Sequence, residues 1–178
     1  MTLLMQSHDK YRIALLSAYA LALHGFEGIL PTPIPWLRLG LANIITLTTL
    51  LLYGLRAAIM VTLIRVILGS LFTGTFLGPA FILSFGGGVT STLAMGLVLS
   101  LMPKLFGPVG LSLIGALFHN IAQLLLAYVI FIQRIEAILL ISPVIILIGT
   151  MTGSVNGAVS DLLIKNLKKT DEKDKNTQ

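Results

Sequence analysis

Long apolar stretches alternate with short polar or turn-forming segments along almost the whole chain. Most of these stretches are close to the roughly 20 residues that an α-helix needs to cross a bilayer. The breaks between them contain proline, glycine or charged residues, which are typical of helix ends. The pattern therefore predicts an all-α integral membrane domain over residues 13–164. Its expected spans are residues 13–29, 39–53, 57–72, 80–102, 109–131 and 137–164.

Two polar segments flank this domain. Residues 1–12 carry charges ahead of the first apolar run. That run has no small-residue cleavage site and is followed by further spans. The N-terminal segment is therefore not expected to be a secretory signal peptide. Residues 165–178 are hydrophilic and of mixed charge, and this composition predicts a disordered tail.

Composition excludes a soluble domain, because 56% of the residues are hydrophobic, only 11% are charged and the mean hydropathy is +0.96. The chain has no cysteine, which excludes disulfides, thiolate metal sites and cysteine nucleophiles. The net charge of +5 could suggest a nucleic-acid partner, but the charges lie at segment ends and in the tail, as in membrane proteins.

The distribution of Lys and Arg predicts the orientation. With six spans and both termini cytoplasmic, nine of the 12 Lys and Arg residues lie inside, two lie outside and Arg65 is embedded. This agrees with the positive-inside bias of multi-pass proteins. The fourth span is less regular, because residues 73–79 and Gly86–Gly88 interrupt the apolar pattern. One helix with a closely packed or flexible glycine section is expected, and a re-entrant piece before it is the alternative.

Arg65 is the most informative polar residue, because it lies in the middle of an uncharged run. A cation at that depth costs roughly 2.5–3.5 kcal/mol on insertion scales unless it faces protein, a watery cavity or an anion. Arg38 lies at the outer end of the preceding span, and Asn43 lies within that span. Two guanidinium groups directed into one cleft would suit a carboxylate or phosphate. The structural alternatives are a buried pairing of Arg65, for instance with Glu27, and an interfacial position for Arg38 beside Trp36.

A second polar group lies in the fifth span. His119 and Gln123 are four residues apart and share one helix face, with Asn120 beside them. These side chains could contact a substrate or form hydrogen bonds between helices, and the sequence leaves both interpretations open. A metal site is disfavoured, because no second His or carboxylate follows at ligand spacing. His24 and Glu27, on the first span, could hold a proton or complement a substrate, and helix capping and hydration at the membrane interface are the structural alternatives.

Small residues predict close helix packing. Gly149, Gly153 and Gly157 recur every four positions in the sixth span and leave one face nearly bare. On the first span, alanines recur at the same spacing and form a stripe of small side chains, which consists of Ala14, Ala18 and Ala22. This stripe either packs inside the bundle or docks a second membrane subunit.

Four segments together resemble a known family. They are residues 33–43, residues 65–70, residues 74–79 and the pair His119–Asn120. The chain is similar over about residues 10–165 to the bacterial membrane family called "heptaprenyl diphosphate synthase component I" or "Gx transporter". That family in turn resembles the substrate-binding (S) components of energy-coupling-factor transporters.

The resemblance implies a six-helix bundle in the bacterial cytoplasmic membrane that holds a small molecule beneath a loop lid. The lid would contain Pro31, Pro33, Pro35 and Trp36. It also implies docking of a transmembrane coupling subunit, which works with ATPases, on an Ala-x-x-x-Ala face that Ala14, Ala18 and Ala22 could supply.

The residues also limit the chemistry. Prenyl diphosphate synthases bind magnesium through aspartate-rich clusters, whereas the four aspartates here are scattered. No P-loop motif for ATP is present either. The chain is therefore expected to be no enzyme, and at most an accessory subunit of a prenyl synthase. No cofactor is predicted.

The leading hypothesis from sequence is a subunit that captures a small anionic or polar-headed molecule for uptake. Its expected contact residues are Arg38, Asn43, Arg65, His119, Asn120 and Gln123, with Gly86–Gly88 allowing close approach. The alternative is a non-catalytic membrane anchor for a soluble prenyl synthase. Proton-coupled transport through Glu27 and His24 is a weaker third hypothesis.

Overall fold

The computed structural model describes residues 7–29 and 40–176, and within these ranges every regular element is helical. The helices are α1 (Ser7–Ile29), α2 (Ala42–Tyr53), α3 (Leu55–Phe72), α4 (Pro79–Leu101), α5 (Pro108–Leu126), η1 (Ala127–Ile132) and α6 (Ile135–Asn176). The π-helix η1 continues directly from α5, so the two together form the fifth predicted span. The all-α class predicted from the sequence is confirmed.

Glycine and proline set the helix boundaries where the sequence places them. Gly54 has a φ of 84°, which favours glycine, and separates α2 from α3. Pro79 and Pro108 lie in the first turns of α4 and α5, where the missing N–H removes no helical hydrogen bond. α4 runs without a break through Gly86–Gly88, so the single-helix interpretation of this region is confirmed.

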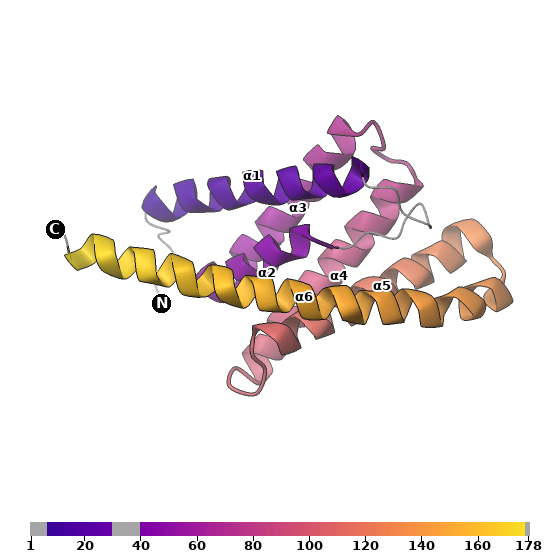
Figure 1. The fold of residues 1–178 in the computed structure, drawn as a ribbon. Helices are drawn as coiled ribbons and strands as arrows, with labels where there is room; N and C mark the ends of the chain where they lie inside the picture. Colours follow the sequence, from indigo (N-terminus) through magenta and orange to yellow (C-terminus); the bar gives the residue numbers. More distant parts are fainter. Residues whose placement is uncertain (1–6, 30–39, 177–178) are drawn as a thin grey trace.

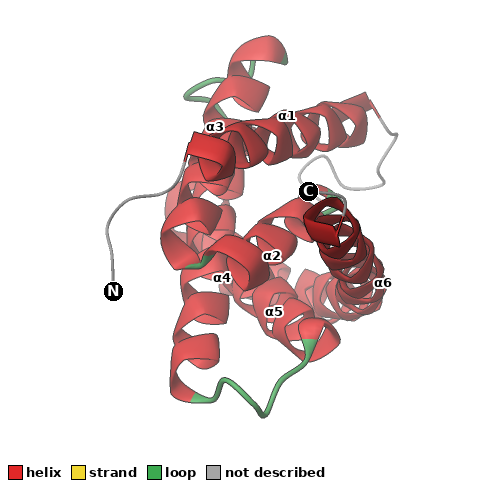
Figure 2. Ribbon diagram, turned by 90° about the vertical axis from the view of Figure 1, so that its left-hand side faces the viewer, coloured by secondary structure: helices red, strands yellow, loops and turns green. Residues whose placement is uncertain are grey.

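The short helix α2 is the centre of the bundle (Figures 1 and 2). It contacts all five other α-helices, while α4 packs against α3 and α5, and α5 packs against α6. Seven consecutive residues from Ile44 to Leu50 are buried. A helix surrounded in this way needs no solvent-facing polar side, and its polar residues, among them Asn43 and Thr46, hydrogen-bond within the protein.

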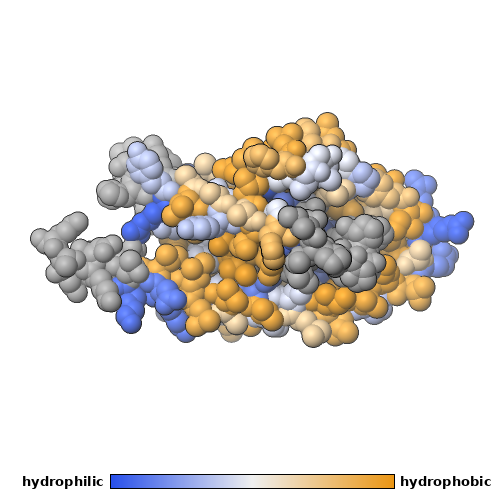
Figure 3. Space-filling model, turned by 45° about the horizontal axis from the view of Figure 1, so that its top comes forward, coloured by the Kyte–Doolittle hydropathy of each residue, from blue (hydrophilic) through white to orange (hydrophobic). Residues whose placement is uncertain are grey.

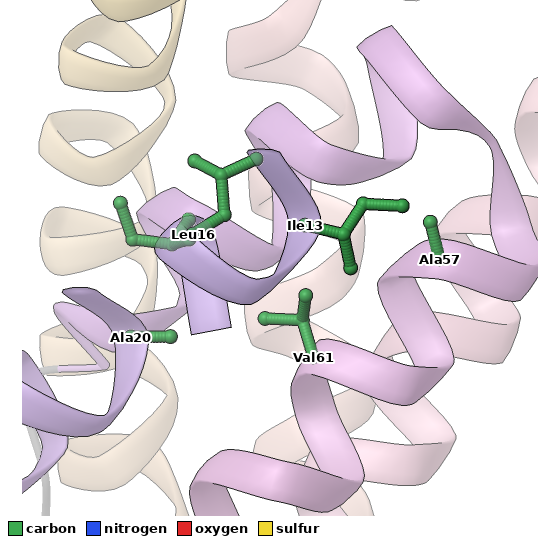
Figure 4. Close-up of a cluster of buried hydrophobic side chains, with 6 residues drawn as sticks. Ile13, Leu16, Ala20, Ala57 and Val61 are labelled. Atoms are coloured by element: carbon green, nitrogen blue, oxygen red, sulfur yellow. The ribbon is translucent and has the colours of Figure 1, made fainter. Parts of the chain in front are cut away.

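One apolar cluster joins α1 to the centre of the bundle. Ile13, Leu16 and Ala20 of α1 pack against Ala57 and Val61 of α3 (Figure 4), and Ile45 of α2 completes the cluster. Lipid tails are as apolar as these side chains, so within a bilayer the cluster is stabilised mainly by close packing.

Four helical segments are long and apolar enough to cross a membrane: Leu55–Phe72, Pro79–Leu101, Pro108–Ile132 and Ile135–Lys169. Helix α2 is apolar but has only 12 residues. On the face drawn in Figure 3, the most hydrophilic of the coloured residues lie toward the two ends of the molecule, and most coloured residues between them are hydrophobic. The chain is thus a multi-pass membrane protein; six crossings and cytoplasmic termini stay predictions.

The predicted disordered tail differs from the structure, in which α6 continues past residue 164 to Asn176. Its 42 residues correspond to a rod of about 63 Å. Leu, Lys and Glu are good helix formers, and Lys165 Nζ lies 2.6 Å from Asp161 Oδ2 one turn earlier. Composition alone therefore underestimated the local preference of this segment for helix.

Candidate functional site

Arg65 points into the bundle rather than toward lipid. Arg65 is only 4% exposed, and its Nη2 donates a 2.6 Å hydrogen bond to Oδ1 of Asn43 on α2. On the other side lies α4, where a Cβ on Gly88 would be 3.6 Å from Nη2. The structure thus brings together Arg65 and Asn43, two residues that the sequence proposed as neighbours.

A chain of buried threonines runs beside this pair. Thr62 Oγ1 of α3 lies 2.9 Å from Thr92 Oγ1 of α4 and 3.4 Å from Thr46 Oγ1 of α2. Thr92 Oγ1 also donates to the carbonyl of Gly88 at 2.8 Å. Hydroxyl groups therefore link three helices through the apolar interior, as polar side chains often do in membrane bundles.

Helix α6 contributes two polar residues that sequence reasoning missed. Asn156 Nδ2 donates to the carbonyl of Gly40 at 3.0 Å, and Ser160 Oγ donates to the carbonyl of Ile44 at 3.1 Å. Gly40 has a φ of 71°, which favours glycine, at the start of the segment that leads into α2. The available signal was an asparagine between Gly153 and Gly157 in an apolar span, but its partner is 116 residues away.

A small polar void lies between these helices. Asn43, Ser91, Ser112 and Asn156 contribute its polar lining, and its volume of about 10 Å³ is close to that of one water-sized probe. Ser91 is 1% exposed, and its Oγ has no hydrogen-bond partner among the described residues. We call Asn43, Arg65, Ser91, Ser112 and Asn156 the polar centre. In this conformation it is closed, and the void is far smaller than a metabolite.

The polar residues of α5 face two different helices. Buried Gln123 and half-buried His119 lie over Gly87 of α4, where an added Cβ would be 2.9 Å from His119 Cε1. Asn120 faces α6 instead and donates to the carbonyl of Ile145 at 3.3 Å. Asn120 therefore forms a hydrogen bond between helices, which is one of the two interpretations that the sequence left open.

The three consecutive glycines of α4 accommodate neighbouring side chains. Leu126 lies over Gly86, His119 and Gln123 lie over Gly87, and Thr62, Val66 and Arg65 approach Gly88. Because successive helical residues point in different directions, the glycines let both α3 and α5 approach α4 closely. In this conformation the space above them is occupied by protein, which supports the packing interpretation of this segment.

Glu27 and His24 are both buried at the end of α1. The Glu27 carboxylate accepts a 2.5 Å hydrogen bond from the N–H of Leu41, at the beginning of α2. A carboxylate is stabilised there by the unpaired N–H groups and by the helix dipole. The His24 ring packs over Gly69 of α3. Among the interpretations of Glu27, the helix-capping contact is the one observed.

The remaining predicted site residues divide into two groups. Ala14, Ala18 and Ala22 are exposed on α1, so this stripe does not pack inside the described bundle. Arg38 and the predicted lid residues Pro31, Pro33, Pro35 and Trp36 lie outside the described residues. Across the described part of the chain, no group of three or more His, Cys, Asp or Glu side chains could hold a metal ion.

These features define an all-α multi-pass membrane protein with a closed polar centre between α2, α3, α4, α5 and α6. The family model of heptaprenyl diphosphate synthase component I matches residues 16–163. The chain therefore belongs to the heptaprenyl diphosphate synthase component I family, as its sequence motifs suggested. No curated protein and no solved structure matches it. Membership of a component I family fits a protein that is at most a non-catalytic accessory subunit.

Proposed function

We propose that this protein is the non-catalytic membrane component of a heptaprenyl diphosphate synthase. The family match over residues 16–163 carries the proposal, because it covers α2 to α5, most of α1 and most of α6. The prenyl-transfer chemistry belongs to a separate catalytic subunit, which would supply the aspartate-rich magnesium site that this chain lacks.

A membrane platform has a physical advantage for such an enzyme. Each added isoprene unit makes the product more apolar, so the growing chain partitions increasingly into lipid. A synthase held at the bilayer surface releases its product where the product is stable. The membrane in question would be the bacterial cytoplasmic membrane.

The basic end of α6 is the proposed contact for the catalytic subunit. Lys165, Lys168 and Lys169 are exposed on this part of the helix, on the side predicted to be cytoplasmic. A basic surface of this kind favours a partner with an acidic patch, and it would increase the rate of association.

Recruitment to vesicles tests this role. The catalytic prenyl synthase subunit from the same genome is mixed with vesicles that contain or lack this protein, and the vesicles are floated. The catalytic subunit should float only with the protein-containing vesicles, and less when Lys165, Lys168 and Lys169 are changed to Gln. Equal flotation with empty vesicles would contradict the proposal. Changing Lys104 to Gln, an exposed lysine on the same predicted side, is the matched control.

A second function, capture of a small anionic or polar-headed molecule for uptake, is favoured by one specific observation. The buried Arg65 donates to Asn43, and Asn43 lines the small void together with Ser91, whose hydroxyl has no hydrogen-bond partner among the described residues. Such a group of donors suits a carboxylate or phosphate. The void of about 10 Å³ means that the helices around the polar centre would have to separate to admit a ligand. The exposed alanine stripe of α1 would then dock the coupling subunit that works with ATPases.

Native mass spectrometry of the purified protein tests capture. A co-purifying metabolite that is lost in Arg65→Ala but retained in Arg56→Ala, a change at an exposed arginine on the same helix, would support it. Repeated recovery of protein without a metabolite or a coupling subunit would count against it.

A further inference from the structure

A groove of about 1270 Å³ lies between α1 and α6, and α2 forms part of its wall. Apart from one Arg and one Lys, the groove is lined by apolar and aromatic side chains, among them Leu15, Tyr19, Phe26, Tyr53 and Leu163. We call it the α1–α6 groove. It is separate from the polar centre, and neither the predicted substrate contacts nor the helix packing explains it.

Two cations lie at one end of the groove. Arg12 near the N-terminus of α1 and Lys168 near the C-terminus of α6 are both exposed, and both line it. The two helices run in opposite directions, which brings these ends to the same end of the molecule (Figures 1 and 2). The groove is thus amphipathic along its length, with a basic end and an apolar body. It complements a ligand with an anionic head and a long apolar tail.

The length of the groove limits that tail. From Arg12 to Phe26 the lining of α1 extends over 14 helical steps, about 21 Å. The acyl chain of a phospholipid spans about half of the roughly 30 Å hydrocarbon core, or about 15 Å. A tail that fills the groove is therefore longer than one ordinary acyl chain.

We propose that the α1–α6 groove binds a polyprenyl diphosphate, with the tail along α1 and the diphosphate between Arg12 and Lys168. This inference rests on the proposed role in a prenyl synthase and deepens it, because it assigns the product class to a particular surface. Two cations from different helices suit a group with several anionic oxygens, since each side chain can pair with a separate oxygen. In this arrangement the protein receives the product as it leaves the catalytic subunit.

Binding to the full chain in phosphatidylcholine nanodiscs tests the proposal. The probe is radiolabelled heptaprenyl diphosphate, with heptaprenol, inorganic diphosphate and phosphatidylglycerol as competitors. We expect unlabelled heptaprenyl diphosphate to compete at least tenfold better than heptaprenol, which lacks the charge, or inorganic diphosphate, which lacks the tail. Competition by phosphatidylglycerol at similar concentrations would overturn the proposal, because the groove would then be an ordinary lipid site.

Variants locate the bound molecule. Ala22 lines the groove, so Ala22→Phe should fill it and weaken binding of heptaprenyl diphosphate at least fivefold. Ala158→Phe places the same ring at an exposed position of α6 outside the groove lining, and should leave binding unchanged. The pair Arg12→Gln and Lys168→Gln should weaken binding of the diphosphate about tenfold or more, with no effect on heptaprenol.

Unaltered thermal unfolding shows that each variant folds, since all four substituted positions are exposed. Unchanged binding in Ala22→Phe and in the double charge variant would exclude the α1–α6 groove as the site. Failure here is distinguishable from failure of the proposed function. Because Lys168 is also part of the proposed contact for the catalytic subunit, Ala22→Phe is the variant that separates them. Loss of binding in Ala22→Phe with intact vesicle recruitment would leave the membrane-component role standing, whereas failed recruitment by the unaltered protein would remove that role.

Discussion

The interface between α5 and α6 depends on glycines that allow the two helices to approach closely, and Gly157→Ala tests this dependence. A Cβ at Gly157 would lie 2.6 Å from Val109 Cα, 2.9 Å from Ser112 Cβ and 3.2 Å from Pro108 O. Two of these atoms are backbone, so the methyl group can be accommodated only if α5 and α6 move apart. Overpacking of this kind typically costs about 1–3 kcal/mol.

The assay is thermal unfolding of the purified protein in detergent, followed by circular dichroism. For a chain of this size each kcal/mol lowers the Tm by roughly 2–4 °C. We therefore expect Gly157→Ala to lower the Tm by at least about 2 °C and by up to about 12 °C.

Gly25→Ala is the matched control. Gly25 is also helical, but nothing lies within 4 Å of an added Cβ there. Alanine is favoured over glycine within a helix by up to about 1 kcal/mol, so this change should leave the Tm unchanged or raise it. A Gly157→Ala variant as stable as Gly25→Ala would refute the close approach of α5 and α6.

Four further substitutions test three other contacts by the same unfolding assay. In a double-mutant cycle, Thr62→Val and Thr92→Val should couple by about 0.6 kcal/mol, the average for hydrogen bonds between membrane helices, and additive effects would contradict their contact. Asn120→Ala removes the donor to the Ile145 carbonyl and should cost about 1 kcal/mol, so wild-type stability would contradict that bond. Lys165→Ala should cost no more than about 0.5 kcal/mol, because its ion pair is exposed, and a loss above about 1 kcal/mol would indicate a further partner.

The helices could be predicted because apolar runs separated by glycine and proline report directly on membrane-spanning segments. The expected span 57–72 corresponds to α3, Leu55–Phe72, and the expected span 80–102 corresponds to α4, Pro79–Leu101. The tail prediction differs from the structure, in which α6 continues to Asn176, because the hydrophilic composition that suggests disorder is also rich in helix-forming residues. The structure adds a π-helix, Ala127–Ile132, at the end of α5, for which the sequence carried no signal.

The polar centre could be predicted only in part. The high cost of a lone cation in hydrocarbon predicted that Arg65 faces inward, and Asn43 was a reasonable neighbour because it lies on the preceding helix. Asn156 could not be placed, because the sequence does not say that α6 packs against the start of α2. Asn120 and His119 are adjacent in sequence, yet they face different helices, and only the packing order of the bundle decides this.

The glycine stripe of α6 illustrates a pattern with a direct structural meaning. Gly153 and Gly157 were predicted to permit close helix approach, and the structure confirms this: a Cβ at Gly153 would lie 2.9 Å from Ala116 Cβ of α5. This prediction does not depend on which helix is the neighbour, because any helix can approach closely where side chains are missing.

Prenyl-transfer activity reconstituted in vesicles tests the central claim most directly. Incorporation of labelled isopentenyl diphosphate is measured with this protein alone, with the catalytic subunit alone and with both. The account predicts no product from this protein alone, and more product or longer chains from the pair than from the catalytic subunit by itself. Identical yield and chain length with and without this protein, or synthesis by this protein alone, would contradict it.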